Sequence, residues 1–395
     1  MDRVERVGRV ERAAALAAEL DEAGLLAPGW RPAFEKVRRD QFIPDRIWIA
    51  GQGGYRALSR GDDPERWWNA VYADVSVVTQ VEDGEHREVS LHPSSSASMP
   101  RMVAIMLAEL DVGDGHRVLE IGTGTGYNAA LLCERLGDRL VTTVEIDHAV
   151  ADQARAALRR AGYAPTTLTA DGADGWPENG PYDRVIATCA VRDVPHAWVA
   201  QTRPGGVVVT PWGSAFYNGV LLRLTVGADG TAVGRVVDDS SFMWLRAQRP
   251  GVGDVMSHVR DTARATLSRT RLDPRAVSDD DAAFAVGVQV PGCRYTVGWG
   301  SGGEADECTL WLADPDTGSW ACADYEPGLA EFAVEQYGPR RLWEEVEAAY
   351  RWWGHAGRPA RERFGLTVTP EKQTVWLDGP DDPQAPISSA VPYRA

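Results

Sequence analysis

The stretch from Val118 to Tyr127 reads Val-Leu-Glu-Ile-Gly-Thr-Gly-Thr-Gly-Tyr, and it decides the fold. Its apolar residues predict a short buried strand over 118–121, and the alternating glycines predict a tight bend into an apolar helix over 128–136. Glycine has no Cβ, so it can adopt a positive φ and let a ligand lie against the main chain. The N-terminus of the helix adds free N–H donors and a partial positive charge. The stretch therefore predicts a ligand-binding bend between a strand and a helix.

An acidic residue follows these glycines at a spacing typical of nucleotide sites. A second strand is predicted over 140–144, and it ends in Glu145-Ile146-Asp147. An acid about 20 residues beyond such glycines accepts hydrogen bonds from the two ribose hydroxyls of an adenosine cofactor. The two strands and the bend together predict an adenosine site.

A dinucleotide suits this pattern less well than S-adenosyl-L-methionine does. The dinucleotide motif requires glycine where Tyr127 stands, and Glu120 would repel a pyrophosphate. S-adenosyl-L-methionine carries no phosphate, and its ammonium and sulfonium groups are attracted by an acid at the end of the strand. We therefore expect S-adenosyl-L-methionine as the cofactor.

Composition and charge exclude several classes of partner. The chain has 395 residues with a formal net charge of −16, so the counterion release that drives nucleic-acid binding is not available to it. Its 44% hydrophobic residues include no apolar run long enough to cross a membrane. Its 5 cysteines form no Cys-x-x-Cys pair, which favours a reducing cytosol and gives no support for a metal site. We expect a cytoplasmic protein that binds neither nucleic acid nor membrane, with a monomer favoured.

The order of the predicted elements indicates an α/β fold with extensions at both ends. Strands and helices alternate over 117–213, which predicts a Rossmann-like, mostly parallel, doubly wound sheet. We expect an N-terminal helical extension and lid over 1–80, the cofactor-binding domain over 81–248 and a C-terminal α+β domain over 249–395. The boundary at 249 rests on an Arg-Pro-Gly-Val-Gly run, after which strands, including one expected at 282–290, precede a long helix.

A serine run precedes the glycine motif and permits two interpretations. Residues 93–100 read Pro-Ser-Ser-Ser-Ala-Ser-Met-Pro, and a helix is predicted directly after them. One interpretation is a solvated loop in which Ser98 caps the helix, with Pro100 in its first turn. The other places the serine hydroxyls in a functional site. Spacing alone leaves both interpretations open.

The chain resembles the class I methyltransferases, in particular the protein-L-isoaspartate O-methyltransferase family. Residues 120–126 are similar to the family's glycine motif, residues 144–146 to its ribose site, and Asp171-Gly172 to its Asp-Gly adenine segment. Ser98-Met99-Pro100 resembles the family's Ser-x-Pro substrate segment, which lies ahead of the same helix. The resemblance covers roughly residues 33–245, and it implies that 81–248 is an S-adenosyl-L-methionine-dependent methyltransferase domain.

The resemblance also implies roles for particular residues. Ser98 is expected to donate a hydrogen bond to an aspartyl carboxylate and aim one oxygen at the methyl group, with Ser96 assisting. A carboxylate is already an anion at neutral pH, so the reaction requires positioning and no general base. The expected cofactor-binding residues are Glu120, Ile121, Gly122, Thr123, Gly124, Gly126, Tyr127, Glu145, Ile146, Asp171, Gly172 and Thr188.

Two departures from the family pattern bear on the substrate. The usual Thr-hydrophobic-Ser becomes Ser96-Ala97-Ser98, and the repair enzymes of the family are expected to lack a counterpart of residues 249–395. The longer architecture is similar to actinobacterial homologues associated with ribosomally made peptides, the lanthipeptides and graspetides, which methylate an ordinary aspartate. We therefore expect methylation of an aspartyl side chain in a modified ribosomal peptide, leading through a succinimide to isoaspartate or a retained imide. In this interpretation the C-terminal domain recognises the peptide.

Two other functions remain open from the sequence. The chain could be a general protein-L-isoaspartate repair methyltransferase, acting on damaged proteins. It could also be a non-catalytic peptide-binding module on a methyltransferase scaffold, although the retained Glu120, Glu145, Asp171 and Ser98 argue against that function.

Overall fold

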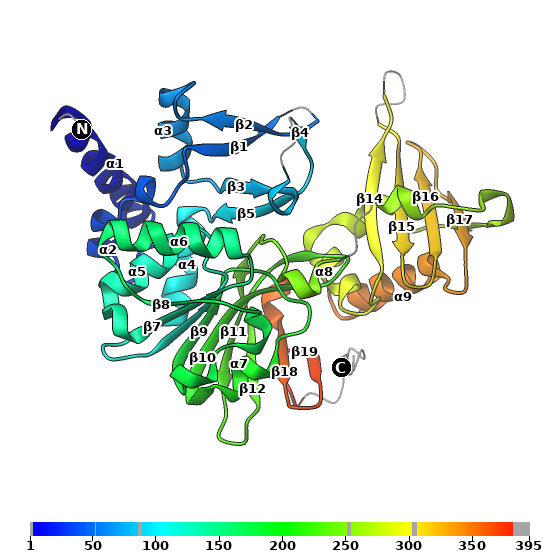
Figure 1. The fold of residues 1–395 in the computed structure, drawn as a ribbon. Helices are drawn as coiled ribbons and strands as arrows, with labels where there is room; N and C mark the ends of the chain where they lie inside the picture. The colour runs from blue at the N-terminus through cyan, green and yellow to red at the C-terminus, as the bar shows by residue number, and fades with distance from the viewer. Residues whose placement is uncertain (1–2, 52, 86–88, 251–253, 302–305, 382–395) are drawn as a thin grey trace.

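The protein consists of a central sheet with a smaller sheet on either side (Figure 1). The computed structural model describes residues 3–381 apart from 52, 86–88, 251–253 and 302–305, and apart from the side chains at 3–7 and 9. The centre of the predicted boundary, 251–253, lies outside the described residues.

The central sheet has nine strands in the order β19-β18-β12-β11-β10-β9-β6-β7-β8. Neighbours from β10 to β8 pair in parallel, whereas the pairs from β10 to β19 are antiparallel. The predicted α/β fold is confirmed, and its parallel half carries the glycine motif. The strands are β6 (Val118–Ile121), β7 (Val141–Glu145), β8 (Thr166–Thr169), β9 (Tyr182–Ala187), β10 (Thr202–Gly213), β11 (Asn218–Val226), β12 (Ala232–Asp239), β18 (Phe364–Val368) and β19 (Gln373–Leu377).

Helices cover both faces of this sheet because its strands are apolar on both faces. In β9, for example, Val185 belongs to one core and its neighbour Ile186 to the other. One core is shared with α1 (Arg3–Glu22), α2 (Arg31–Lys36), α4 (Pro100–Leu110), α5 (Tyr127–Leu136) and α6 (His148–Ala161). The other is shared with α7 (His196–Ala200), α8 (Asp280–Gly287) and α9 (Leu342–His355). Within the described residues, no helix combines the length and the apolar character needed to cross a bilayer.

The N-terminal region forms a five-stranded antiparallel sheet that the sequence did not predict. Its order is β4-β2-β1-β3-β5, and α3 (Pro64–Tyr72) packs against it. This sheet crosses the expected boundary at residue 80, so the N-terminal extension combines helices with strands and is not helical throughout. The serine run gave no strand signal because it lacks alternating apolar residues. The strands are β1 (Arg46–Gly51), β2 (Gly54–Ser59), β3 (Val77–Val81), β4 (Val89–Ser90) and β5 (Pro93–Ala97).

The C-terminal region forms a second five-stranded antiparallel sheet, in the order β13-β17-β16-β15-β14, with α8 and α9 on one face. The predicted strand at 282–290 is wrong, since α8 occupies 280–287 and buries its apolar residues between two cores. Residues 364–377 return to the central sheet, so cutting the chain at 249 would remove two of its strands. The strands are β13 (Thr266–Thr270), β14 (Arg294–Trp299), β15 (Cys308–Asp314), β16 (Ser319–Tyr325) and β17 (Phe332–Tyr337).

Candidate active site

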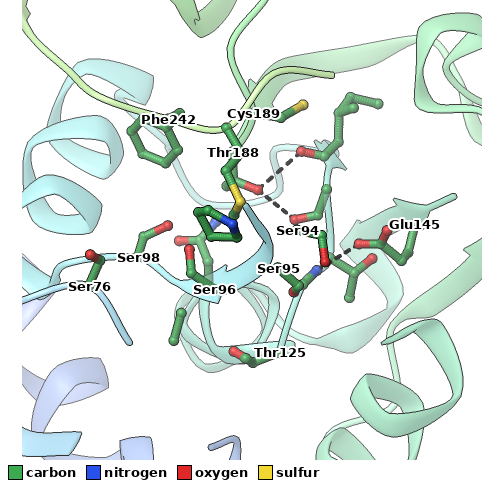
Figure 2. Close-up of a pocket in the computed structure, with 18 of the residues that line it drawn as sticks. Ser76, Ser94, Ser95, Ser96, Ser98, Thr125, Glu145, Thr188, Cys189 and Phe242 are labelled. Carbon is green, nitrogen blue, oxygen red and sulfur yellow. Dashed lines mark hydrogen bonds between the residues drawn. The ribbon is translucent and has the colours of Figure 1, made fainter. Parts of the chain in front are cut away.

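A cavity of about 530 Å³ lies between the N-terminal sheet and the carboxyl ends of β6, β7 and β9. Figure 2 shows Ser76 and Ser98 at one end of it and Glu145 at the other, with Thr188 and Phe242 facing the serines. The structure brings together here all but two of the residues predicted from the sequence. Those that line the cavity are Ser96, Ser98, Glu120, Ile121, Gly122, Thr123, Gly124, Tyr127, Glu145, Ile146, Gly172 and Thr188.

The motif has three glycines, and Gly122 and Gly126 must be glycine for different physical reasons. All three have a positive φ, of 90° at Gly122, 53° at Gly124 and 88° at Gly126. A Cβ at Gly122 would come within 2.8 Å of Thr188 Oγ1, so the loop can lie against β9 only without a side chain there. A Cβ on Gly126 would meet Leu158 of α6 at 3.2 Å. Gly126 does not line the cavity, and what requires glycine there is helix packing.

Hydrogen bonds hold the loop in this shape. The Thr188 hydroxyl lies 2.5 Å from Gly122 O, and its N–H donates to Ile121 O at 2.8 Å. Glu145 accepts from Gly124 N through Oε2 at 2.9 Å and from Asp147 N through Oε1 at 3.1 Å. Each carboxylate oxygen can accept a further bond. Glu145 therefore braces the loop and keeps capacity for two ligand hydroxyls.

Glu120 occupies a buried network behind the loop. Asn128 Nδ2 donates to its Oε1 at 2.8 Å and Thr143 Oγ1 to its Oε2 at 2.6 Å, and the residue is 0% exposed. Burial raises the pKa of Glu120 to about 7, although the two hydrogen bonds oppose this shift. Asn128 Oδ1 is a buried acceptor with no partner among the described residues. An acid and an unmet acceptor thus adjoin the cavity at the glycine loop.

The serine run is a strand edge that faces the cavity, not a solvated loop. Helix α4 begins at Pro100, which has no N–H, and the N–H of the next residue, Arg101, donates to Asp74 Oδ1 at 2.8 Å. Because Asp74 accepts there, Ser98 does not cap the helix. Among the described residues, the hydroxyls of Ser96 and Ser98 make no hydrogen bond, and both line the cavity. Of the two interpretations of this run, the structure supports hydroxyls available to a ligand.

Asp171 is the second predicted residue that does not line the cavity. Its carboxylate accepts from Ala173 N at 2.9 Å and so caps a short turn beside Gly172, which does line it. Cys189 also lines the cavity, but burial raises the pKa of its thiol, so it stays protonated at neutral pH. A role for Asp171 in adenine binding stays a prediction.

Residues 241–246 and Arg249 form a wall of the cavity that the sequence did not predict. Strand β12 ends at Asp239, and the chain then leaves the sheet. Ala190 N donates to Met243 O and Leu245 N to Ala190 O, each at 2.8 Å. Such an irregular segment has no periodicity by which it could be found.

Two arginines of this segment connect it to both neighbouring sheets. Arg249 Nη1 lies 2.8 Å from Asp83, in the turn that follows β3 of the N-terminal sheet, and Arg246 Nη2 lies 3.4 Å from the same carboxylate. Arg246 Nη1 also lies 3.3 Å from Asp147, the N-cap of α6. These ion pairs connect the N-terminal sheet with the cofactor end of the central sheet.

S-adenosyl-L-methionine fits the residues present. The glycine loop lines the cavity with main chain at Gly122 and Gly124, Glu145 has acceptor capacity for ribose hydroxyls, and Asn128 Oδ1 lacks a donor. An ammonium group supplies such a donor, and Glu120 supplies negative charge when ionised. No phosphate-binding cationic cluster accompanies the glycines in the described lining, where the cations are Arg246 and Arg249, both paired with acids.

Comparison with known proteins agrees with this site. Residues 68–249 match the family model for protein-L-isoaspartate(D-aspartate) O-methyltransferase. The protein-L-isoaspartate O-methyltransferase of Anaeromyxobacter dehalogenans is 45% identical over 157 residues, which cover 39% of this chain and 74% of the relative. Protein-L-isoaspartate O-methyltransferase 2 of a Polaromonas species is 35% identical over 166 residues, or 42% of this chain and 78% of the relative.

The chain belongs to the protein-L-isoaspartate O-methyltransferase family. S-adenosyl-L-methionine is the cofactor of this family's methyl transfer, in agreement with the glycine loop described above. A further family member, from Methanosarcina mazei, is 39% identical over 148 residues, and the match spans 37% of this chain and 60% of that relative's length.

A solved structure of a protein-L-isoaspartate O-methyltransferase shares the fold over 92% of this chain and 99% of its own, with a TM-score of 0.53 and 20% identity. This similarity extends well beyond residues 68–249 and reaches the C-terminal region. The expectation that the repair enzymes of the family lack a counterpart of residues 249–395 therefore does not hold for every protein of this name, because one of them shares the fold of much of that region. The length of the chain does not separate a peptide-tailoring enzyme from other family members.

Proposed function

We propose that this protein is a carboxyl O-methyltransferase that transfers the methyl group of S-adenosyl-L-methionine to an aspartyl or isoaspartyl carboxylate in a polypeptide. One observation carries this proposal: the free hydroxyls of Ser96 and Ser98 share a single cavity with the glycine loop and Glu145. Hydroxyl donors suit a carboxylate acceptor, because an ionised carboxylate is a hydrogen-bond acceptor only.

The bound cofactor supplies an electrophilic methyl group on a sulfonium. A carboxylate is the nucleophile in its ordinary ionisation state, so the chain has no proton to remove. What remains for the protein is to hold and orient the carboxylate and to exclude water, and orientation alone can account for a large part of a rate enhancement. Ser98 donates to one carboxylate oxygen and leaves the other directed along the cavity, and Ser96 assists.

The ester that forms explains why such a reaction matters for peptides. Methanol is a better leaving group than hydroxide, so the backbone nitrogen of the next residue attacks the ester carbonyl, methanol departs and a succinimide closes. Hydrolysis of the succinimide gives aspartate or isoaspartate, or the imide persists. This step uses only groups of the peptide.

Two substrates are compatible with this chemistry. Family membership favours the isoaspartyl carboxylate of a protein, since the relatives are named for protein L-isoaspartate. The second candidate is an ordinary aspartyl side chain in a ribosomally made peptide of the lanthipeptide or graspetide kind. The hydroxyl-rich wall favours it, since Ser76, Ser94, Ser95, Ser96 and Ser98 make this wall more polar than a wall of the Thr-hydrophobic-Ser pattern.

The C-terminal sheet is proposed to hold the substrate peptide outside the cavity. Its edge strands β13 and β14 carry two large apolar side chains in solvent, with Leu267 77% and Trp299 62% exposed. β14 has no lysine or proline that would discourage pairing with an extended peptide, and its sequence is Arg-Tyr-Thr-Val-Gly-Trp. An extended peptide could add to this edge through its backbone.

A paired-peptide assay tests the proposal. The protein is incubated with S-adenosyl-L-methionine and two peptides that differ only in aspartate or isoaspartate at one position, and products are followed by mass spectrometry. Gain of a methyl group followed by loss of methanol is expected for one of them, and the preferred peptide identifies the substrate class. Calorimetric titration with S-adenosyl-L-homocysteine is the control, since absence of binding would favour a non-catalytic module and contradict the proposal.

A further inference from the structure

Arg39 is a buried cation whose hydrogen bonds go to main-chain carbonyls. It lies in a short 3₁₀ turn, Arg39–Gln41, and is 0% exposed. Its partners belong to two segments near the cavity, the end of α3 with its link to β3, and the end of the serine run. The contacts are Nη1 to Val71 O at 2.8 Å and Ala73 O at 3.2 Å, and Nη2 to Val75 O at 3.0 Å, Ala97 O at 3.2 Å and Ser98 O at 2.8 Å.

Burying this charge costs free energy, which an apolar residue would avoid if packing were the only role of the position. A buried charge is normally paired with an opposite charge, but Asp74, the acid whose charge acts on Arg39, is bonded to Arg101 at 2.9 Å. Arg39 Nε is buried with no partner among the described residues. Burial lowers the pKa of Arg39 to about 10, so the side chain is still charged at neutral pH. The planar guanidinium fork of Arg39 donates to five carbonyls, which no apolar side chain could do.

The same turn also contacts the opposite wall. Phe42, which directly follows it, packs edge-on against Tyr127 with ring centroids 5.9 Å apart and an interplanar angle of 60°. Tyr127 is the first residue of α5, next to Gly126 of the glycine loop. Residues 39–42 therefore touch the serine run on one side and the glycine motif on the other.

The links from Arg39 end directly beside the free hydroxyls. Ser98 O is one of its acceptors, and the Ser98 hydroxyl lines the cavity. Val75, another acceptor, precedes Ser76, whose side chain lies at the same end of the cavity (Figure 2). A main-chain shift at either residue would move a hydroxyl relative to the glycine loop.

We propose that Arg39 is a positioning residue for methyl transfer: by fixing the carbonyls of Ala97 and Ser98, it sets the direction of the Ser98 hydroxyl toward the carboxylate. The inference rests on the proposed function, because it assigns Arg39 a role through Ser98. Arg39 touches neither cofactor nor substrate. Displacement of a reacting group by about 1 Å can cost a hundredfold in rate, so the fork's geometry matters as well as its charge.

A double-mutant cycle tests this role. Arg39→Lys keeps the charge and loses the fork, and we expect about a tenfold loss of kcat with little change in S-adenosyl-L-homocysteine affinity. If Arg39 acts through Ser98, the same change made in Ser98→Ala should cost less than about twofold, because the hydroxyl it directs is gone. Rates are expressed per binding site for S-adenosyl-L-homocysteine, so that unfolded protein does not count.

Arg184 offers a matched control at the other end of α4. Its guanidinium is also buried and donates to main-chain carbonyls, those of Leu110, Asp111 and Asp183. Arg184→Lys should lower the melting temperature as Arg39→Lys does, leave kcat within about twofold, and add independently to Ser98→Ala.

Each outcome decides the proposal. Unchanged kcat in Arg39→Lys, or an equal loss with and without the Ser98 hydroxyl, would overturn it while leaving the proposed function intact. Failure of both Arg39→Lys and Arg39→Gln to bind S-adenosyl-L-homocysteine would assign Arg39 to the fold itself and also overturn it. Inactive wild-type protein in the paired-peptide assay would instead count against the proposed function.

Discussion

The two five-stranded sheets on either side of the central sheet have the same size and antiparallel pairing but different relations to the cavity. The N-terminal sheet sends residues of β3 and β5 into it. The C-terminal sheet contributes no lining residue within the described part of the chain. It has a separate core with α8 and α9 and exposes aromatic surface instead.

This difference separates two requirements of an enzyme that acts on a polypeptide. Orientation of the reacting carboxylate demands groups held within fractions of an ångström. The N-terminal sheet is held against the central one by a hydrogen bond from Gln80 to Asp147 and by the ion pairs of Asp83 with Arg246 and Arg249. Holding the rest of a peptide tolerates distance and looser contacts. We therefore expect substitutions in the N-terminal sheet to change kcat and those in the C-terminal sheet to change KM.

Ser98→Ala should have the largest effect. Loss of a donor aimed at the reacting group typically costs about a hundredfold in kcat, and cofactor affinity should not change. Ser94→Ala, in the neighbouring strand β5, is the control, since its hydroxyl is already bonded to Gln80 at 2.8 Å and should matter less than about fivefold. Steady-state kinetics with the preferred peptide measure both. Equal effects would show that Ser98 has no special role.

Glu120→Gln should change how stability depends on pH. Burial raises the pKa of Glu120 from 4.5 to about 7, so the folded state holds a proton that the unfolded state has released between these values. This contribution to stability is complete below pH 4.5 and is lost as the pH rises through about 7. The variant should match wild type near pH 5 and exceed it near pH 8.5 by roughly 1–3 kcal/mol. Urea unfolding at both pH values checks this, and parallel curves would contradict it.

Glu120→Gln also tests whether the negative charge of Glu120 attracts the cofactor. Ionised Glu120 would favour an ammonium, so affinity for S-adenosyl-L-homocysteine should rise through about pH 7 in wild type by roughly tenfold more than in Glu120→Gln. Comparing the two proteins cancels the titration of the ligand. Calorimetry at pH 6 and 8.5 provides the measurement.

Asp83→Asn should have a smaller effect, because it loosens the N-terminal sheet without touching the site. Asp83 is paired with Arg246 and Arg249, and partly exposed ion pairs contribute about 0–1 kcal/mol. We expect a two- to fivefold fall in kcat that disappears at high salt. Asp378→Asn, which breaks the comparably exposed pair with Arg363 at the far edge of the central sheet, should leave kcat unchanged.

Trp299→Ala should have the smallest effect and should fall on KM alone. Most residues of a binding surface cost less than about 1 kcal/mol when truncated, so a two- to fivefold rise in KM is expected for a long peptide and none for a short one. Leu329→Ala removes another exposed side chain and serves as the control. A fall in kcat would place the C-terminal sheet closer to the chemistry than the comparison implies.

Local sequence patterns were enough to predict the parallel half of the central sheet and most of the cavity-lining residues that belong to it. Gly122, Gly124 and Glu145 obey short-range geometric rules, so their positions follow from spacing. Ser98 required the family resemblance, because a helix cap and an active-site hydroxyl look alike in sequence and only the position of Asp74 distinguishes them.

Long-range contacts account for what could not be predicted. Strand β5 is rich in serine and is a strand only because β3 pairs with it. Arg39 looks like any surface arginine until the carbonyls of 97 and 98, far along the chain, are folded onto it. Glu120 lines the cavity, as its place in the motif predicts, but its burial and its hydrogen bonds from Asn128 and Thr143 could not be predicted from the sequence.

Because β12 pairs with β18, the C-terminal sheet is an insertion within the central sheet. Ala232 pairs with Val368, although residues 240–363 lie between the two strands. During synthesis, β18 and β19 of the central sheet therefore emerge only after the whole C-terminal sheet. The long loop between β12 and β18 must close late in folding. Both ends of the insertion leave from neighbouring strands, so a different distal module could be exchanged there without altering the path of the strands that hold the cofactor.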